Sequence, residues 1–316
     1  MAPAVSILIT TWNGIELVRD CLGAVAARTA GIDYETIVVD DASTDETAAM
    51  LGRDFPAVRL LVRPINGGFV RANNDGVRAA RGQYVFLLNS DTLLLNNAVK
   101  ILADYLDANP GVGVCGGWLT DRDGSSQVSY GDPPSLAQAL ADALFLNDLF
   151  PALGLPNRGV APRAAAGRPM PVGYITGADL MIRRSLVERI GLFDERYEAY
   201  CEEVDLCRRV RTAGGSMVHF VPEARICHLG GYSYGKRGKR HVQLQSISTR
   251  RYLVKHHGAL YATLVLALYA WHYAVKGAVR SLRVPLSSPG HRVDRRAAAL
   301  GAWYRVRYSL RPGGGA

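Results

Sequence analysis

The sequence of 316 residues lacks the signatures of several common protein classes. The first predicted strand runs into TTWNG rather than into a G-x-G-x-x-G loop, and no Walker A sequence occurs. Hydride transfer on a dinucleotide and P-loop chemistry are therefore disfavoured. No helix-turn-helix, zinc-finger or RNP sequence is present either, so nucleic acid is not an expected partner.

Cysteines are few, and their spacing suggests no pairing. The five cysteines are an odd number without a C-x-x-C pair, which is typical of reduced thiols in the cytosol rather than of a disulfide framework. The N-terminus lacks the charged segment of a signal peptide and runs directly into a predicted strand. We therefore expect the protein to act on the cytoplasmic side of the membrane.

Acidic residues are almost absent from the last quarter of the chain. Residues 236–316 contain 16 Lys and Arg but a single Asp, whereas residues 1–235 contain 21 Lys and Arg and 27 Asp and Glu. The formal net charge of +9 therefore comes from the tail. A basic tail that bears Tyr and Trp predicts contact with an anionic membrane surface, and a merely solvated tail is the alternative.

One long uncharged run lies in this tail. The sequence GALYATLVLALYAWHYAV occupies residues 258–275, which barely reaches the roughly 20 residues that a membrane-spanning helix needs. Basic residues on both sides favour a helix that lies in the membrane interface, and a helix packed on the body is the alternative. We expect a location peripheral to the inner face of the plasma membrane.

Short β-branched runs alternate with helical patterns through the first third of the chain. Because the predicted strands are almost continuously apolar, both of their faces should be buried. The pattern predicts an α/β fold with a mostly parallel central sheet flanked by helices, with ligands at the carboxyl ends of the strands. The expected strands are 5–10, 35–40, 58–62 and 83–89, and the expected helices lie near 14–27, 45–53 and 68–80.

The rest of the chain is less regular. A further strand is expected at 111–117, and the segment 131–171, rich in Pro, Gly and Ala, contains one plausible helix at 135–150. We interpret this segment as an insertion or flap beside the site. The expected organisation is one domain over 1–235, followed by a basic, helical, membrane-associating region over 236–316.

Six motifs follow one another along residues 4–232. They are VSILITTWNG, ETIVVDDASTDET, NGGFVRANNDGVRAARGQYVFLLNSDT, GYITGADLMIRR, FDERYEAYCEEVDLCRRVRTAGG and ICHLGG. In this order and spacing the sequence resembles the family 2 glycosyltransferases of the GT-A fold, in particular the branch of bacterial rhamnosyltransferases.

This resemblance implies the nucleotide-diphospho-sugar transferase fold, here with a C-terminal helical tail. It also implies an inverting transfer of a hexose to a hydroxyl of a glycan or lipid-linked acceptor in cell-surface polysaccharide synthesis. The implied donor is dTDP-rhamnose, or otherwise a UDP-sugar.

The resemblance places the nucleotide at the ends of the first two strands. Asp40 would accept the ring N–H of uracil or thymine. The neighbouring donor-binding residues are Thr10, Thr11 and Asn13. Asn66 stands in a glycine-rich turn before a helix, and with Arg71 it would approach the phosphates or the sugar. A tight turn followed by helix packing is the alternative for this segment.

A divalent cation is expected at Asn89-Ser90-Asp91, which stands in the place of the family's D-x-D motif. A bound cation neutralises the charge that grows on the leaving diphosphate. Because the first acid is replaced by Asn89, Asp91 must be the main ligand, while Asn89 and Ser90 belong to the donor site. His228 in ICHLGG matches the histidine that completes the family's metal site, and this ligand set suits Mn²⁺ or Mg²⁺.

The acidic run at residues 202–205 is the expected source of the catalytic base. In an inverting transfer the acceptor hydroxyl loses a proton as it attacks, so a carboxylate must lie near it. The family's usual pattern is E-D-x-D, and the resemblance assigns the base to Glu203. Asp205 is the competing candidate, or it forms an ion pair with Arg209 on the helix face. The pocket for the sugar and the acceptor is expected at Gly177, Asp179 and Glu202.

Two other functions stay open. A sugar-phosphate nucleotidyltransferase shares the α/β sheet and the metal, but it usually carries a glycine-rich basic loop after the first strand, which TTWNGIELVRD lacks. A non-catalytic scaffold that binds a nucleotide-sugar would keep the metal site and lose the base.

Overall fold

The computed structural model describes residues 2–152, 167–230, 239–283 and 289–310. These residues form two compact units, each described by itself below. The first unit contains residues 2–132, 167–198 and 202–230. The second contains residues 133–152, 199–201, 239–283 and 289–310. Part of the predicted flap, residues 153–166, lies outside the described residues, and the domain boundary at residue 235 stays a prediction.

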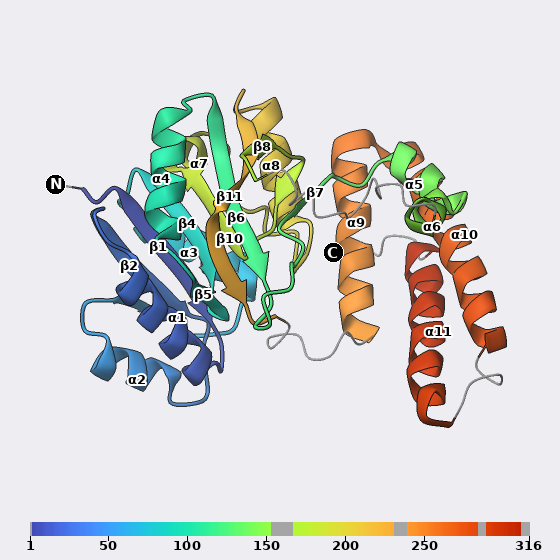
Figure 1. The fold of residues 1–316 in the computed structure, drawn as a ribbon, viewed down its shortest axis with the longest axis horizontal. Helices are drawn as coiled ribbons and strands as arrows, with labels where there is room; N and C mark the ends of the chain where they lie inside the picture. The colour runs from blue at the N-terminus through green and yellow to red at the C-terminus, as the bar shows by residue number, and fades with distance from the viewer. Residues whose placement is uncertain (1, 153–166, 231–238, 284–288, 311–316) are drawn as a thin grey trace. The chain divides into compact units, whose positions relative to one another are not determined.

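The first unit begins with the predicted alternation of strands and helices (Figure 1). Strand β1 pairs in parallel with β2 and β4, and β2 pairs in parallel with β3, so the fold class predicted from the pattern is confirmed. The elements are β1 (Val5–Thr11), α1 (Ile15–Arg28), β2 (Tyr34–Asp40), α2 (Thr47–Asp54), β3 (Arg59–Val62), α3 (Phe69–Ala79) and β4 (Tyr84–Asn89).

The rest of this unit completes a nine-stranded mixed sheet in the order β3-β2-β1-β4-β10-β6-β11-β5, with β8 paired to β11. Strand β10 runs antiparallel to β4, so the first residue of β10 lies beside the end of β4. The elements are β5 (Thr92–Leu94), α4 (Ala98–Ala108), β6 (Val112–Thr120), β8 (Met170–Pro171), β10 (Asp179–Arg183), α7 (Arg184–Ile190), α8 (Glu202–Thr212) and β11 (Met217–His228). Strands β7 (Tyr130–Gly131) and β9 (Tyr174–Ile175) form a separate pair.

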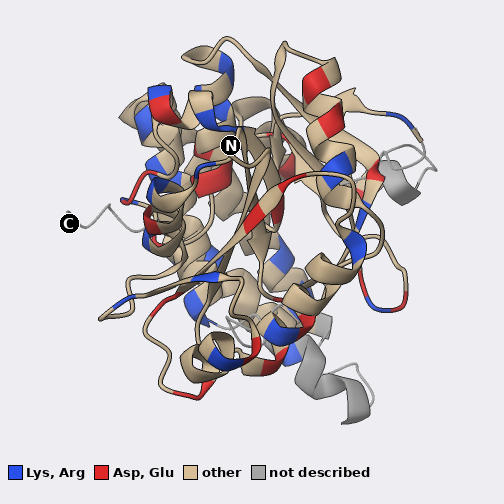
Figure 2. Ribbon diagram, turned by 90° about the vertical axis from the view of Figure 1, so that its left-hand side faces the viewer, with Lys and Arg blue, Asp and Glu red and all other residues tan. Residues whose placement is uncertain are grey.

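Helices cover both faces of the sheet. Ile7 and Ile9 of β1 belong to a buried cluster with residues of α1, α2 and α4. Leu8 points to the opposite face, where a Cβ added to Gly76 of α3 would lie 2.2 Å from its side chain. Helix α3 therefore packs so closely on the sheet that only glycine fits there. Lys and Arg are interspersed with Asp and Glu on the side of the molecule that Figure 2 presents.

The second unit is helical. Its helices are α5 (Leu136–Ala143), α6 (Leu146–Ala152), α9 (Lys239–His257), α10 (Ala259–Arg283) and α11 (Pro289–Leu310). The prediction of a single helix over 135–150 is wrong, because Phe145 has a φ of 58° and ends one helix before the next begins. All of the uncharged run at 258–275 except Gly258 lies within α10, which continues to Arg283. Among the described residues, no helix combines the length and the apolarity needed to span a membrane.

Candidate functional site

Polar residues meet where β1, β2 and β4 end. In the register of the sheet, Thr11 is paired with Asp40, and Thr10 is paired with Asn89. The Thr11 Oγ1 and Asp40 Oδ2 atoms are buried and have no hydrogen-bond partner among the described residues. Buried polar atoms are rarely left unpaired in folded proteins. Two unpaired atoms at neighbouring strand ends are therefore typical of a ligand-binding site.

Asn13 shapes the loops around this edge. Its backbone N–H donates to Ser43 Oγ at 2.9 Å, and its side-chain Oδ1 accepts from the Thr44 N–H at 2.8 Å. Ser43 in turn donates its backbone N–H to Asp40 Oδ1 at 3.0 Å. Asn13, predicted to bind the donor, therefore ties the loop after β1 to the loop after β2. This network occupies one oxygen of Asp40 and leaves the other unpaired.

Trp12 is a residue that the sequence reasoning missed. It lies between Thr11 and Asn13, and 51% of its surface is exposed although it directly follows a buried strand. An indole exposed beside unpaired hydrogen-bonding groups offers a flat surface on which a planar ring can stack. The signal was present in the sequence as a tryptophan at the end of the first strand.

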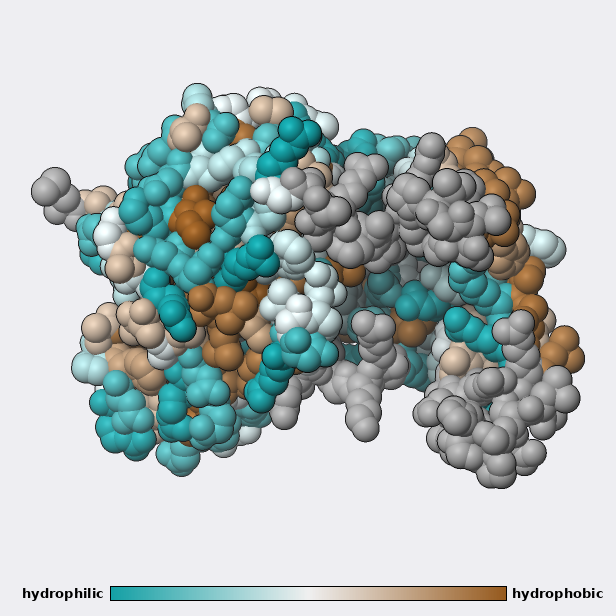
Figure 3. Space-filling view, viewed as in Figure 1, coloured by the Kyte–Doolittle hydropathy of each residue, from teal (hydrophilic) through white to brown (hydrophobic). Residues whose placement is uncertain are grey.

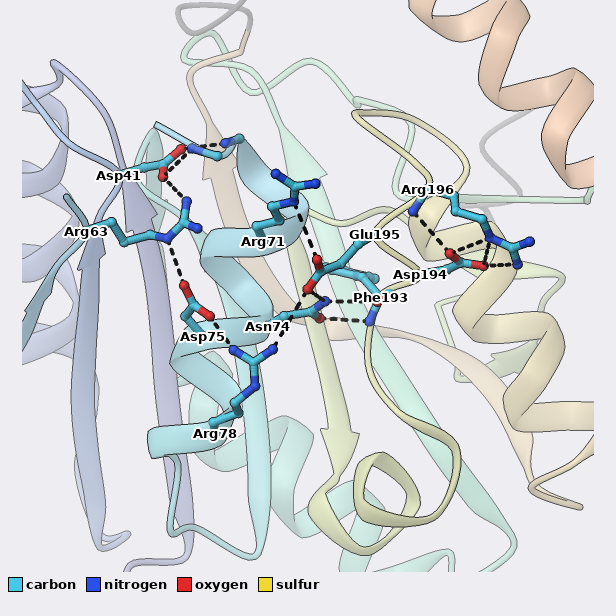
Figure 4. Close-up of polar contacts among 12 residues, drawn as sticks. Asp41, Arg63, Arg71, Asn74, Asp75, Arg78, Phe193, Asp194, Glu195 and Arg196 are labelled. Carbon is cyan, nitrogen blue, oxygen red and sulfur yellow. Dashed lines mark hydrogen bonds and ion pairs between the residues drawn. The ribbon is translucent and has the colours of Figure 1, made fainter. Parts of the chain in front are cut away.

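The glycine turn before α3 is held by Asp41. The carboxylate accepts hydrogen bonds from the backbone N–H groups of Gly67 at 3.0 Å and Gly68 at 2.7 Å, and it also pairs with Arg63 (Figure 4). Gly68 has a φ of +82°, which favours glycine. Asn66 precedes this turn and is exposed. Asp41 thus fixes the conformation of the turn, and Asn66 lies on its exposed side.

Helix α3 also holds the segment that leads to α8. Asn74 Nδ2 donates to the Phe193 carbonyl at 2.9 Å, and Asn74 Oδ1 accepts from the Phe193 N–H at 3.0 Å (Figure 4). Arg71 forms an ion pair with Glu195 at 3.4 Å. Arg71, predicted to bind the donor, is therefore engaged with this segment, and the role of Asn74 was not foreseen.

Asp91 and His228 come together from distant parts of the chain. Strand β11 pairs antiparallel with β5, so His228 lies opposite Thr92, and the Leu229 N–H donates to the Asp91 carbonyl at 2.8 Å. His228 Nε2 lies 3.3 Å from Asp91 Oδ1. The predicted metal ligands are thus within reach of one ion.

Gln127 orients this histidine and was missed from the sequence. Gln127 Oε1 lies 2.9 Å from His228 Nδ1 and accepts a hydrogen bond from Nδ1–H, so Nε2, which faces Asp91, is the ring nitrogen that can bind a metal. The amide is itself held, because its Nε2 donates to the His228 carbonyl at 2.6 Å and to Asp121. Hydrogen bonds of this kind fix the tautomer of a metal-binding imidazole.

The donor set fits a hard divalent cation. Among the residues that the structure describes, no group of three His, Cys, Asp or Glu side chains surrounds one point. Mg²⁺ and related ions are usually held by one or two protein ligands together with substrate phosphates and water. Asp91 and His228 therefore suit an ion that arrives with a diphosphate. Asn89 and Ser90, both half-buried, border the same site.

Two buried carboxyls stand at the start of α8. Glu202 Oε2 and Glu203 Oε2 are buried, and neither has a hydrogen-bond partner in the part of the chain that the structure describes. Burial raises the pKa of Glu203 to about 7, and burial together with the neighbouring Glu203 raises the pKa of Glu202 well above its usual value. Tyr200 and Cys201, just before them, have φ values of 68° and 64°, a strained conformation for residues other than glycine. Such strain is concentrated at functional sites.

Gly177 lies beside Glu203. A Cβ added to Gly177 would lie 4.0 Å from Cβ of Glu203 and 3.7 Å from the ring of Phe69. Phe69 directly follows the glycine turn that Asp41 holds. The structure therefore brings the glycine turn, the segment of Gly177 and the acidic helix α8 to one place, where Phe69 lies between the turn and Gly177.

Asp205 has a different environment from Glu203. Its side chain is fully buried, and Oδ2 accepts from Arg209 Nε at 2.8 Å. Arg209 also donates to the carbonyl of Ile190 at 2.7 Å, so the pair anchors the segment after α7. The ion pair considered as the alternative for Asp205 is present, and this geometry favours Glu203 over Asp205 as the base.

Asp179 is buried at the start of β10. Its Oδ2 accepts from the Gly117 N–H at 2.6 Å, while its Oδ1 has no partner within the described ranges. Burial raises the pKa of this carboxyl well above its ordinary value. The register pairs Asp179 with Leu88, one residue before the end of β4, so β10 begins beside the strand end that carries Asn89.

A mixed sheet with these polar strand ends is the architecture of the GT-A glycosyltransferases, which act on nucleotide-sugars. The sequence matches the family model "Glycosyl transferase family 2" over residues 6–191, and the chain belongs to this family. It is 30% identical to an N-acetylglucosaminyl-diphospho-decaprenol L-rhamnosyltransferase of Mycobacterium tuberculosis over 233 residues, which cover 70% of this chain and 75% of that protein.

Solved structures show the same fold. GalNAc-T7 with UDP, GalNAc and Mn²⁺ superposes with a TM-score of 0.60 and 15% identity, over 96% of this chain and 56% of that one. A mannosyltransferase from Pyrobaculum calidifontis in complex with GDP-Man and Mn²⁺ superposes with a TM-score of 0.59 and 16% identity, over 98% and 89% of the two chains. The GT-A fold expected from the motifs is confirmed.

Proposed function

We propose that this glycosyltransferase is an inverting, metal-dependent hexosyltransferase that acts on a hydroxyl of a lipid-linked or glycan acceptor in cell-surface polysaccharide synthesis. The favoured donor is dTDP-rhamnose, with a UDP-sugar as the alternative. The main support is the pairing of His228 Nε2 with Asp91 Oδ1 at the end of β4. Similarity to a rhamnosyltransferase named for a decaprenol-linked substrate supports the choice of donor and acceptor.

The base of the donor would lie at the ends of β1 and β2. The unpaired Oδ2 of Asp40 accepts the ring N–H of thymine or uracil, and Trp12 stacks on the ring. The diphosphate then extends toward Asp91. A Mn²⁺ or Mg²⁺ ion bound by Asp91 and His228 would supply positive charge that stabilises the leaving nucleoside diphosphate.

Glu203 would remove the proton from the acceptor hydroxyl. A pKa of about 7 suits a general base near neutral pH, because the carboxylate is partly ionised and still basic enough to take a proton. Attack from the face opposite the nucleotide inverts the anomeric centre. Asp179 and Glu202 would contact sugar hydroxyls, since each has a buried oxygen without a partner.

The tail supports a peripheral location on the inner face of the plasma membrane. It carries 16 of the 37 Lys and Arg of the chain, and the proposed acceptor is itself lipid-linked. The proposed organisation is a catalytic domain over 1–235 followed by a membrane-associating region over 236–316.

The test is a panel of dTDP-rhamnose, UDP-glucose, UDP-galactose and GDP-mannose, with Mn²⁺ or Mg²⁺ titrated and release of nucleoside diphosphate measured. We expect turnover with one donor, abolished by EDTA and by Asp91→Ala. Gln127→Ala should need about 10–100 times more metal, because His228 loses its orienting hydrogen bond.

Three results would contradict this function. If EDTA left the turnover of every donor unchanged, the reaction would not depend on a metal ion. Release of pyrophosphate from a nucleoside triphosphate and a sugar phosphate would indicate a nucleotidyltransferase. Donor binding without any transfer to an acceptor, unaffected by Glu203→Gln, would indicate a scaffold.

A further inference from the structure

Helix α10 carries an apolar stripe on its outer surface. Leu260 is 88% exposed, Leu264 49%, Trp271 59% and Leu282 73%. These positions are separated by 4, 7 and 11 residues, which are close to whole numbers of helical turns, so the four side chains lie on one face. The stripe extends over roughly 33 Å, nearly the full length of the helix.

The opposite face of α10 is already used within the second unit. Ala262, Val265, Leu266 and Ala270 are buried, and α10 packs against α5, α9 and α11. The helix is therefore apolar on both sides, and only one side has a partner among the described residues. Figure 3 shows hydrophobic side chains gathered along the part of the surface where α10 lies in Figure 1. Exposed apolar surface of this extent marks an interaction site.

The net charge of the segment that contains α10 favours an anionic occupant. Helix α10 contains no Asp or Glu, and residues 236–316 contain 16 Lys and Arg against one Asp. A second copy of this chain would bring the same excess of positive charge to the contact, which is repulsive. Anionic lipid headgroups complement it, and leucine and tryptophan are the side chains that enter the boundary between headgroups and acyl chains.

We propose that the stripe of Leu260, Leu264, Trp271 and Leu282 lies on an anionic membrane, with α10 parallel to the surface. The apolar side chains enter the interface while the Lys and Arg of the tail neutralise lipid phosphates. No described helix has the length and apolarity to span the bilayer, which agrees with contact along the surface. The proposal deepens the peripheral location proposed above, and it does not depend on catalysis.

The experiment is flotation of the full-length protein with vesicles, without donor or metal. Vesicles of phosphatidylcholine alone are compared with vesicles of equal parts phosphatidylcholine and phosphatidylglycerol. The test variant is Leu264→Gln/Trp271→Gln/Leu282→Gln. The matched control is Ile65→Gln/Leu95→Gln/Met217→Gln, which replaces three similarly exposed apolar residues of the first unit. All six positions are on the surface, so both variants should fold, which circular dichroism verifies.

We expect the wild type and the control to float with the anionic vesicles only, and the α10 variant to bind at least about tenfold more weakly. Quenching of tryptophan fluorescence by brominated acyl chains should be lost in Trp271→Phe but retained in Trp118→Phe. Equal flotation of both triple variants would overturn the proposal. So would a wild-type dimer that binds no vesicles and dissociates in the α10 variant, because the stripe would then be a contact between copies.

Because vesicle binding is measured without substrate, a failure of the membrane proposal can be told apart from a failure of the proposed activity. An α10 variant that leaves the vesicles but still releases nucleoside diphosphate from the donor supports both proposals. If the wild type binds vesicles but turns over no donor, the membrane proposal stands and the proposed activity is contradicted.

Discussion

His228 illustrates how single residues of this site acquire their roles from their neighbours. An isolated histidine in a sequence is usually an ordinary core or surface residue. Here Gln127 binds its Nδ1 and Asp91 faces its Nε2, so the ring is oriented and the nitrogen that can bind a metal points to a carboxylate. The same holds for Asp40, because Ser43 donates to one of its oxygens while the other is buried with no partner among the described residues.

Glu203 and Asp205 differ in the same way, although only two positions separate them. Asp205 is neutralised by Arg209, whereas Glu203 has a buried oxygen without a partner. A carboxylate committed to an arginine is a poor proton acceptor, and a buried unpaired one is a better base. The site therefore distinguishes two acids of one helix by pairing, because only Asp205 has an arginine beside it.

Titration of Glu203 should govern the pH dependence of the reaction. Only the ionised carboxylate can take the proton, so kcat/KM should rise with pH with a midpoint near the pKa of about 7. Glu203→Gln should lower kcat by about 10²–10⁴-fold and leave donor binding intact. Initial rates over a range of pH, together with calorimetric donor binding, measure both effects.

Glu203→Asp is the control for this prediction, because it restores the residue usual in the family and should keep the pH dependence at a reduced rate. If Asp205→Asn rather than Glu203→Gln removed the rise with pH, the base would be Asp205.

At the scale of elements, α3 connects the two sides of the site. Its first residue follows the glycine turn held by Asp41, and its middle holds Phe193 through the paired hydrogen bonds of Asn74. The segment from Phe193 then leads to α8 and to Glu203. A single helix thus positions both the donor-side turn and the segment that carries the base.

Asn74→Ala should therefore slow transfer more than it weakens donor binding. The variant leaves the Phe193 N–H and carbonyl without partners, which costs about 1–3 kcal/mol and loosens the segment before α8. We expect kcat to fall about tenfold. Steady-state kinetics and the Kd for donor separate the two effects.

Asn73→Ala is the matched control, since among the described residues the Asn73 side chain bonds to the Phe69 carbonyl within α3 and not to the segment of Phe193. Equal losses of kcat in the two variants would mean that α3 acts only through its own stability.

For the molecule as a whole, the buried carboxyls of the site lower the free energy of unfolding at neutral pH. The folded-state pKa of Glu203, about 7, lies above its unfolded value of 4.5. The stability that follows from this shift is fully present below pH 4.5 and is lost as pH rises through about 7. Glu202 and Asp179 act in the same direction, because burial raises their pKa values as well.

The free energy of unfolding should therefore depend less on pH in Glu203→Gln than in the wild type. Between pH 8 and pH 6 the wild type should gain about 1 kcal/mol more than this variant. Urea denaturation at both pH values measures the difference, and Glu223→Gln, which changes an exposed carboxylate, should behave as the wild type. A variant with unchanged pH dependence would show that Glu203 titrates alike in the folded and unfolded chains.

The sequence by itself determined the fold class, and it predicted the edge of the sheet at which a ligand binds. Apolar strands that end in Thr10, Asp40 and Asn89 predict a parallel arrangement, because pattern and polarity are local properties of the chain. The order of the motifs also indicated the family, and through it predicted roles for Asp91, Glu203 and His228.

Only the tertiary structure decided which of these residues meet. Gln127 and His228 are 101 positions apart, and Asn74 and Phe193 are 119 apart, so their pairing follows from strand order and helix packing that no local pattern contains. The break at Phe145 depends on backbone conformation, and the free face of α10 depends on which side the other helices cover. Periodicity shows that a helix has apolar faces, but the packing of the rest of the chain determines which one stays exposed.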